Sequence, residues 1–399
     1  MKLATLRTGG DGRLLIVSRD LAYAEFAVAA PTLQAALDNW ATVEPDLRAQ
    51  AARLDTDGAG DAIAVDMAAL DAVLPRGYQF LDASAFLAHN HILADAWGFE
   101  KRGEHEPPLM YQGISHRYLA PHEDVVFPDI RHDVDFEAEI GVITDAVPMG
   151  ITPEAALGHV RLIVIINDWS LRAFGPGEMK GGFGFIHAKP PSTLSAFAVT
   201  PDELGDAWRD GRVHLPLRLW RGDALFGEPL GGAMHFGFGD LIAHAAATRD
   251  LCAGTVIGSG TVSNYDADRV GSACIAERRA LDTLAGRAAT PFLRDGERVR
   301  LALGEAGAGI AGLIDQRVRI VSGGCRSPIH PLTRHASAGW HLPTRLRLIL
   351  WEMPACAGMT IGVGFALAKV GRPYSASQGG LVPYSRNSSS ITTLIFGLR

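Results

Sequence analysis

Hydrophobic residues alternate with polar ones in short segments over most of the chain. Such alternation, bounded by glycine or proline, is typical of β-strands. We predict strands at five segments, DFEAEIGVIT (135–144), RLIVIIND (161–168), VHLPLRLWRG (213–222), GTVIGSGTVS (254–263) and RVRLALGE (298–305). Helical spacing is rarer and predicts helices over 83–97, 153–159 and 238–248. Because strands dominate and no regular strand–helix–strand alternation occurs, the pattern predicts an α+β fold with a mixed sheet.

The first 75 residues are predicted to form a small separate α+β domain. Two short strands turn at Gly9–Gly12, and helical periodicity follows at PTLQAALDNW (31–40) and PDLRAQAARL (45–54). Thr32 is a suitable N-cap for the first of these helices. The chain from residue 76 to residue 321 then forms a larger domain.

Charge and cysteine usage narrow the classes of function. The net charge of −7 over 399 residues disfavours a nucleic-acid partner. The four cysteines form no CxxC pair, so a reducing cytoplasm fits better than a disulfide framework. The N-terminus lacks the apolar stretch of a signal peptide. The late apolar stretch Leu346–Lys369 contains Glu352 and Pro354, so a membrane span is not expected.

Residues 322–399 differ in composition from the rest of the chain. They contain eight Lys or Arg and one acidic residue, Glu352, whereas the preceding residues carry 29 basic and 43 acidic residues. The segment is rich in Gly, Ser and Pro and has no sustained periodicity. We interpret it as a poorly ordered extension from a frameshift or a lost stop codon, with an interaction tail as the alternative. On either interpretation we expect no contribution to catalysis.

Two glutamates share one face of the predicted strand 135–144. Alternation puts the apolar residues Phe136, Ala138, Ile140 and Val142 on one face, with Glu137 and Glu139 on the other. Carboxylates two residues apart on a strand lie roughly 6.5–7 Å apart. Burying them costs free energy through desolvation and repulsion unless a hard divalent cation binds both. The alternative is a strand that exposes these acids to solvent.

Two more acids and a histidine are candidates for the same site. Asp168 ends the apolar run 161–168, where an acid can be a ligand or an N-cap for the following turn. Asp82 precedes the predicted helix 83–97 and is its candidate N-cap. His89 follows two helical turns later, which would place it on the same face about 10.5 Å along the axis. The alternative is an ordinary packed or surface histidine.

Lys189 and Glu277 complete the charged candidates. Lys189 lies in FIHAKPPSTLSAF, which has almost no other charge, so a cleft beside carboxylates would suit it. An exposed lysine is the alternative. Glu277 lies in GSACIAERRALD, after a glycine-rich turn, and would otherwise be a solvated acid paired with Arg278 or Arg279.

Together, these residues and their surroundings form an ordered set of motifs. The set is Asp82, His89, Tyr111, Glu137-x-Glu139, Asn167-Asp168-Trp169-Ser170-x-Arg172, Lys189, Thr193, Thr255-x-x-Gly258-Ser259-Gly260, Gly271-Ser272 and Glu277. The set resembles the fumarylacetoacetate hydrolase family over about residues 76–320, and NDWSxR some thirty residues after ExE is its most specific part. The resemblance implies a mixed β-sheet roll, usually a homodimer, with the N-terminal segment as a cap domain.

The resemblance also implies a role for each matching residue. It implies Mg²⁺ or Ca²⁺ ligands at Asp82, Glu137, Glu139 and Asp168, with Thr193 at the edge of the metal site. His89 matches the general base and Glu277 the carboxylate that orients it. Arg172 and Lys189 match groups that stabilise negative charge on the substrate. Positions that match substrate contacts are Tyr111, Ser84, Thr255 and Ser259.

The implied activity is hydrolysis of a carbon–carbon bond in a small β-diketo acid. Fumarylacetoacetate, an intermediate of tyrosine and aromatic catabolism, is the expected substrate, with fumarate and acetoacetate as products. Three departures bear on the substrate: no glutamine follows Arg172 closely, and Gly98 and Ser84 replace an arginine and a tyrosine. Acylpyruvate or fumarylpyruvate hydrolysis and oxaloacetate decarboxylation are alternatives on the same scaffold. A non-catalytic metal-binding scaffold is the alternative of another class.

Overall fold

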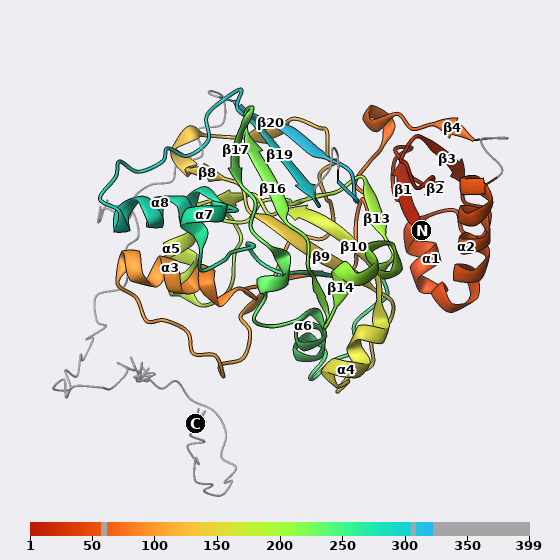
Figure 1. Ribbon diagram of the computed structural model, residues 1–399, viewed down its shortest axis with the longest axis horizontal. Helices are drawn as coiled ribbons and strands as arrows, with labels where there is room; N and C mark the ends of the chain where they lie inside the picture. Colours follow the sequence, from red (N-terminus) through yellow and green to blue (C-terminus); the bar gives the residue numbers. More distant parts are fainter. Residues whose placement is uncertain (57–61, 305–308, 322–399) are drawn as a thin grey trace, which may run out of the picture. The chain divides into compact units, whose positions relative to one another are not determined.

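The computed structural model describes residues 1–56, 62–304 and 309–321 (Figure 1). Within these residues, the larger sheet has eleven strands in the order β4-β3-β2-β1-β13-β10-β9-β18-β5-β6, with β12 also paired to β10. Its strands are β1 (Lys2–Leu6), β2 (Arg13–Val17), β3 (Tyr23–Phe26), β4 (Ile63–Ala64), β5 (Phe80–Ala83), β6 (Met110–Gln112), β9 (Ala138–Thr144), β10 (Val160–Asn167), β12 (Thr193–Leu194), β13 (Phe197–Val199) and β18 (Val256–Gly258). All its pairings are antiparallel except that of β18 with β5, so the sheet is mixed.

A second sheet of five strands runs in the order β17-β16-β19-β20-β7. Its members are β7 (Val125–Phe127), β16 (Leu217–Arg221), β17 (Ala224–Gly227), β19 (Arg298–Leu303) and β20 (Ile314–Ile320). Two short pairs join β8 (Val134–Asp135) to β11 (Ser170–Leu171), and β14 (Trp208–Arg209) to β15 (Arg212–Val213). The described helices are α1 (Leu33–Asp38), α2 (Trp40–Thr56), α3 (Leu87–Trp97), α4 (Pro153–Ala156), α5 (Gly175–Gly181), α6 (Phe238–Ala245), α7 (Ala267–Val270) and α8 (Ile275–Leu284).

The centre of the larger sheet is covered on both faces. Ile140 and Ile165, on β9 and β10, share one core with Leu219 and Leu301 of the smaller sheet. Residues of the opposite parity, such as Val164, pack with side chains of α1 and α2. Because strand side chains alternate between faces, two buried faces explain why β10 is an almost continuous apolar run. The predicted α+β fold with a mixed β-sheet roll is confirmed.

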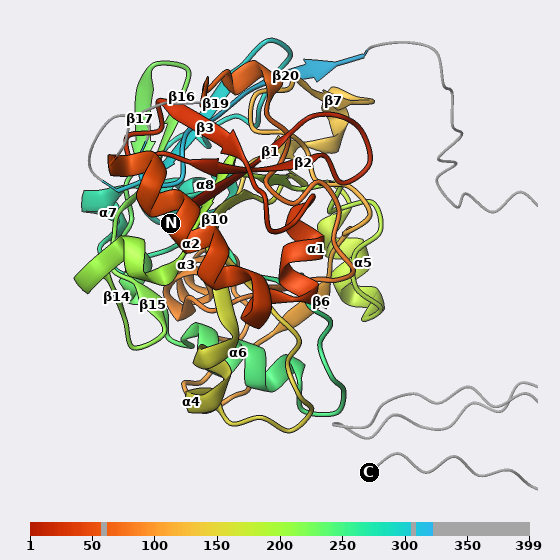
Figure 2. The same cartoon turned by 90° about the vertical axis from the view of Figure 1, so that its right-hand side faces the viewer.

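The N-terminal segment adds strands to the larger sheet. β1 pairs antiparallel with β13, with Lys2 opposite Val199, and β2, β3 and β4 continue outward from it. The helices α1 and α2 lie together beside these strands (Figure 2). The predicted separate domain 1–75 therefore shares its sheet with residues of the larger domain, and the described residues up to 321 belong to one compact unit. The predicted helix N-cap at Thr32 is confirmed, because the Thr32 hydroxyl accepts a hydrogen bond from the Ala35 N–H at 3.1 Å, in the first turn of α1.

One predicted helix boundary is wrong, and the error matters for the site. Asp82 and Ala83 belong to β5, and α3 begins only at Leu87. Asp82 is therefore not a helix N-cap, and the two-turn spacing between Asp82 and His89 does not exist. The reason is tertiary: β5 is held between β18 and β6, which takes up its backbone hydrogen bonds.

The predictions for residues 322–399, including the apolar stretch within them, lie outside the described residues. Among the described residues, no helix is both long and apolar enough to cross a membrane.

Candidate active site

Three carboxylates from separate strands meet in the interior. Asp82 lies on β5, Glu139 on β9, and Asp168 directly after β10. One carboxylate oxygen from each lies within 4.8 Å of the others, and all three residues are buried. β18 runs between β5 and β9, and a Cβ at its Gly258 would lie 2.2 Å from Asp82 Oδ1 and 3.0 Å from Glu139 Oε2. Glycine is required at position 258 because any side chain would occupy the space of these oxygens.

The electrostatics of this carboxylate triad (Asp82, Glu139 and Asp168) suit a hard cation. Desolvation, together with repulsion from Asp168, raises the pKa of Asp82 to about 7. Desolvation and the neighbouring acids Asp82 and Asp168 raise the pKa of Glu139 well above its ordinary value. Both Glu139 oxygens are buried, and within the described part of the chain the neighbouring Asp82 carboxyl is the only group that can share a proton with them. Buried, unpaired carboxylate oxygens are costly, and a divalent cation with oxygen preference would satisfy them.

Asp168 is the best supported of the three acids by hydrogen bonds. The Ser192 hydroxyl donates to its Oδ1 at 2.6 Å, and the Tyr111 hydroxyl donates to its Oδ2 at 2.8 Å. Burial, followed by the charge of Asp168, raises the pKa of Tyr111, so the phenol stays protonated and remains a donor. These bonds fix the orientation of the carboxylate at the end of β10, as second contacts around metal ligands commonly do.

Glu137 lies beside the triad, between two cations. Its Oε1 accepts from Arg172 at 2.5 Å, and its Oε2 pairs with the Lys189 ammonium, which also pairs with Asp168. Burial alone would raise the pKa of Glu137, but Arg172 and Lys189 hold it well below its usual range. The carboxylate triad thus contains three of the four predicted metal ligands. The fourth, Glu137, already has a cationic partner at each of its two oxygens.

His89 and Glu277 form a direct pair. His89 Nδ1 lies 2.7 Å from Glu277 Oε2, and Glu277 is fully buried on α8. The helices that carry them pack together through Ile92 of α3 and Ala280 of α8. The sequence brought His89 into consideration through a helical spacing from Asp82 that does not exist, whereas the pairing with Glu277 matches the role that the resemblance implied.

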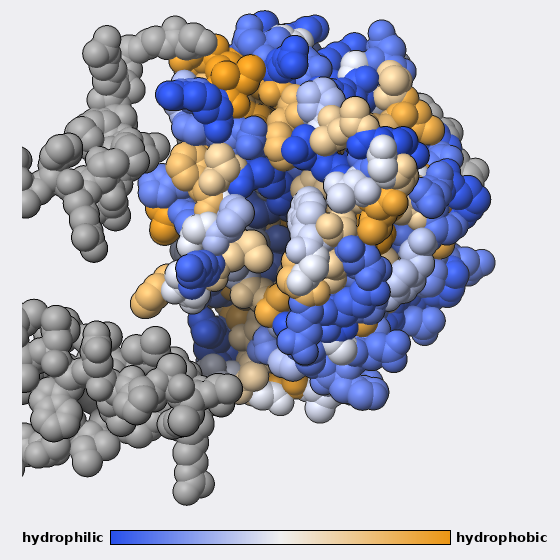
Figure 3. All heavy atoms as spheres, turned by 90° about the vertical axis from the view of Figure 1, so that its left-hand side faces the viewer, coloured by the Kyte–Doolittle hydropathy of each residue, from blue (hydrophilic) through white to orange (hydrophobic). Residues whose placement is uncertain are grey.

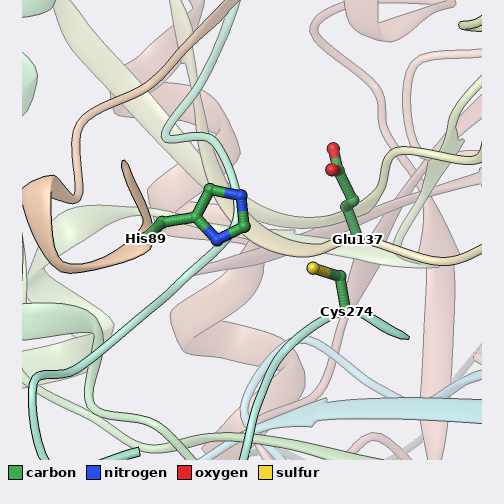
Figure 4. A group of neighbouring side chains, drawn as sticks. All are labelled: His89, Glu137 and Cys274. Atoms are coloured by element: carbon green, nitrogen blue, oxygen red, sulfur yellow. The ribbon is translucent and has the colours of Figure 1, made fainter. Parts of the chain in front are cut away.

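The side chains of His89, Glu137 and Cys274 lie side by side (Figure 4). One ligand-type atom from each lies within 4.8 Å of the others, which resembles a second metal site. Two facts argue against a cation there: Glu137 is ion-paired through both oxygens, and burial raises the pKa of the Cys274 thiol well above its ordinary value.

The side of the molecule that carries α3, α5 and α8 is hollowed by a furrow (Figures 1 and 3). Hydrophilic and hydrophobic side chains alternate along its walls. The His89 side chain is 15% exposed, whereas the Glu277 side chain behind it is 0% exposed. The imidazole is therefore the member of the pair that solvent can reach, while the carboxylate that holds it is buried.

Three of the other predicted site residues already use their side-chain hydroxyls in hydrogen bonds within the protein. The hydroxyl of Thr193 donates to Gln316 at 2.8 Å and accepts from Trp169 Nε1. The Thr255 hydroxyl donates to the Cys252 carbonyl at 2.7 Å, at the start of β18. The Ser259 hydroxyl donates to the carbonyl of Gly260. These three hydroxyls stabilise the local fold, and their predicted metal or substrate contacts stay predictions.

Ser84 and the two cations retain capacity for a ligand. Ser84 is half-buried just after β5, where its backbone N–H donates to Leu109. Lys189 uses its ammonium on two carboxylates, and an ammonium has three protons. Arg172 directs Nε to Asp135 at 2.8 Å and one further nitrogen to Glu137, out of five N–H donors. The predicted substrate roles of these groups are therefore compatible with their contacts.

Sequence reasoning missed Asp135, Ser192 and Cys274. Asp135 continues the alternation of Glu137 and Glu139 by one more step, so the pattern contained a signal for it. Ser192 and Cys274 lie in irregular segments outside the strands, and no periodic pattern singles them out.

Comparison with known proteins decides the family. The model of the fumarylacetoacetate (FAA) hydrolase C-terminal domain matches residues 79–319, and that of fumarylacetoacetase N-terminal domain 2 matches residues 1–76. The chain belongs to the fumarylacetoacetate hydrolase family. The predicted family membership is thereby confirmed, and the join between the two matches falls close to the predicted boundary at residue 75.

Relatives of this fumarylacetoacetate hydrolase family member carry several activities in their names. A 2,4-didehydro-3-deoxy-L-rhamnonate hydrolase of Sphingomonas sp. (strain SKA58) is 29% identical over 111 residues, which are 27% of this chain and 38% of that relative. The match thus spans less than half of the curated relative. The maleylpyruvate hydrolase of Sphingobium sp. SYK-6 has the same fold, with a TM-score of 0.54 and 16% identity over 80% of this chain and all of that one. That protein has also been solved with manganese(II) and pyruvate.

The raised carboxyl pKa values predict a pH-dependent effect of divalent cations on stability. The pKa of Asp82 is about 7 in the folded protein, against 3.8 ordinarily. In the absence of metal, the contribution of Asp82 to folding stability is therefore fully present below about pH 4 and is lost as the pH rises towards 7. A cation that requires ionised ligands should therefore raise Tm more at about pH 8 than at about pH 5.5. Thermal denaturation with and without Mn²⁺ measures this difference. An equal or larger rise at the acidic pH would show that the cation binds elsewhere.

Proposed function

We propose that this member of the fumarylacetoacetate hydrolase family is a divalent-metal-dependent hydrolase that cleaves a carbon–carbon bond in a β-diketo acid. The observation that supports this most is that Lys189 links the buried carboxylate triad to Glu137, which in turn lies beside His89 of the His89–Glu277 pair. A metal-binding scaffold would need the triad but not a carboxylate-oriented imidazole.

The pair supplies a base for a water molecule. With its Nδ1–H donated to Glu277, the imidazole presents its other nitrogen as an acceptor, which can take a proton from water. The resulting hydroxide adds to a ketone carbon, giving a tetrahedral intermediate. Collapse of that intermediate breaks the bond to the neighbouring carbon, whose electron pair stays with the departing fragment. Protonation of that carbon by the imidazolium completes the hydrolysis, so one water yields one carboxylic acid and one ketone.

The cations hold the negative charge that develops during this sequence. Lys189 and Arg172 already lie against Glu137, and each retains unused donors that can reach substrate oxygens. Asp82, Glu139 and Asp168 would hold the divalent cation, and Mg²⁺ or Ca²⁺ is the ion expected from the family resemblance. When bound, such a cation polarises carbonyl oxygens as a Lewis acid. The manganese in the Sphingobium maleylpyruvate hydrolase supports a divalent cation without choosing among metals.

The substrate has two candidate classes. The sequence resemblance favours fumarylacetoacetate. The names of the relatives favour acylpyruvates, since maleylpyruvate is the substrate named for a protein of the same fold. One structural feature bears on the acyl group within that class: Gly98, where the resemblance implies a carboxylate-binding arginine, ends α3 in the left-handed conformation with φ 76° and offers no side chain to a second carboxylate, such as that of maleylpyruvate or fumarylacetoacetate. Acylpyruvates with uncharged acyl groups are therefore the second candidate. The cytoplasmic, homodimeric state stays a prediction.

A substrate panel tests the proposal. The purified full-length chain is assayed by ultraviolet absorbance with fumarylacetoacetate, fumarylpyruvate and acylpyruvates, with Mg²⁺ or Mn²⁺ and with excess chelator. We expect metal-dependent loss of the diketo chromophore for at least one substrate and no turnover with the chelator. Oxaloacetate is included because decarboxylation needs no activated water. Turnover of oxaloacetate alone would replace hydrolysis by decarboxylation, and no turnover of any substrate with bound metal would favour the scaffold.

A further inference from the structure

Asp135 is a fully buried aspartate whose side chain joins two parts of the site. It lies at the end of β8, two residues before Glu137. Its Oδ1 accepts from the backbone N–H of Ile275 at 2.8 Å, and its Oδ2 accepts from that of Ala276 at 2.9 Å. The same Oδ2 accepts from Arg172 Nε at 2.8 Å. One carboxylate therefore binds both the first turn of α8 and the guanidinium of Arg172, which is ion-paired with Glu137.

The first turn of α8 is the part of the helix that carries Glu277. Its leading N–H groups have no partners within the helix, and a negative charge at a helix N-terminus is favourable. Asp135 takes two of these groups, and Cys274 Sγ accepts the third, from Glu277 itself, at 3.3 Å. Glu277 is thus held by its backbone as well as by its side-chain bond to His89.

Through Arg172, Asp135 is also connected to the carboxylate triad by a series of ion pairs. Arg172 connects it to Glu137, Glu137 pairs with Lys189, and Lys189 pairs with Asp168. The result is an unbroken series of hydrogen bonds and ion pairs from the helix that orients His89 to the acids that would hold the cation. Asp135 is its branching point, because it contacts both the backbone of α8 and the side chain of Arg172.

We propose that Asp135 is a positioning residue that fixes the His89–Glu277 pair relative to the carboxylate triad. The proposal rests on the proposed function, since it deepens the role of the same site. A carboxylate is required because all three of its neighbours are donors. Asparagine would direct an N–H₂ group at one of them, and it would remove the charged partner of Arg172 Nε. A misplacement of about 1 Å between a base and the reacting carbon can cost about 100-fold in rate.

The test is Asp135→Asn, with Asp145→Asn as the matched control. Asp145 follows the opposite end of β9 and accepts from Arg161 Nε at the same 2.8 Å, while its other oxygen pairs with His159 instead of helix N–H groups. We expect Asp135→Asn to lower kcat by about 10–100-fold, with KM and the Mn²⁺ dissociation constant changed by less than about threefold. The acidic limb of the kcat–pH profile should also shift, whereas Asp145→Asn should leave the profile unchanged.

A measurement without substrate separates this proposal from the proposed function. The Nδ1 proton of His89, held by Glu277, should give a strongly downfield proton NMR signal that disappears in His89→Gln. We expect that signal to broaden or move in Asp135→Asn and to persist in Asp145→Asn. An unchanged signal in Asp135→Asn, or an equal loss in both variants, would overturn the positioning role even if the wild type hydrolyses no diketo acid. Should Asp135→Asn not fold, Asp135→Glu, which keeps the charge but displaces the helix, is expected to perturb the same signal, and an unperturbed signal there would overturn the proposal.

Discussion

Replacing His89 with alanine is expected to lower kcat by about 10²–10⁴-fold, the usual contribution of a general base. The dissociation constant for Mn²⁺ should stay within about threefold of wild type, because His89 binds Glu277 and the three acids of the triad are all retained. Steady-state kinetics and calorimetric titration with Mn²⁺ measure the two quantities on the same preparation.

His91→Ala is the matched control for this variant. His91 lies on the same helix, and its ring nitrogens lie 2.9 Å from the Arg102 carbonyl and 3.0 Å from the Tyr265 hydroxyl, away from Glu277. Its replacement should leave kcat within a few-fold of wild type. If His89→Ala instead lost the metal while keeping residual turnover, His89 would be a ligand and the assignment of the base would be wrong.

Glu139→Gln is expected to abolish measurable metal binding and activity together, and to stabilise the metal-free protein. Glu139 has two buried oxygens, and desolvation, followed by repulsion from Asp82 and Asp168, raises its pKa. An amide removes one of the three mutually repelling carboxylates, so the Tm without metal should rise by about 2–4 °C at neutral pH, which corresponds to about 1 kcal/mol. Calorimetry with Mn²⁺ tests the loss of metal binding, and thermal denaturation in excess chelator tests the rise in the metal-free Tm.

Glu137→Gln should change the metal-free stability in the opposite direction. Arg172 and Lys189 hold the pKa of Glu137 below its usual range, which means that its charged form is stabilised. Removing that charge leaves two buried cations with fewer partners, so the metal-free Tm should fall. From the resemblance alone, Glu137→Ala would be expected to lose metal and activity together, as a ligand should. A Tm that falls for Glu139→Gln and rises for Glu137→Gln would reverse the roles assigned to the two glutamates.

The sequence predicted the features that depend on local pattern. Alternation along residues 135–144 predicted Ile140 and Val142 in the core, which the structure confirms, and it separated them from Glu137 and Glu139, which are both buried among polar groups. The apolar run before Asp168 predicted a central strand correctly. These predictions succeed because the side-chain direction of a strand is fixed by its two-residue period, whatever the rest of the fold does.

The sequence failed where an element was set by its neighbours. Asp82 was placed before a helix, but pairing with β18 and β6 makes it part of β5. Only tertiary structure shows that Gly258 leaves room for the carboxylate triad and that Glu137 is ion-paired with Arg172 and Lys189. Only tertiary structure also shows that Asp135 accepts hydrogen bonds from the first turn of α8, the helix that carries Glu277. Asp135 and Ile275, for example, are 140 positions apart along the chain. A pattern within one segment contains no information about which distant strand will lie beside it. Residue types and strand faces were thus determined locally, whereas the partner of each charge was decided by the packing of the strands.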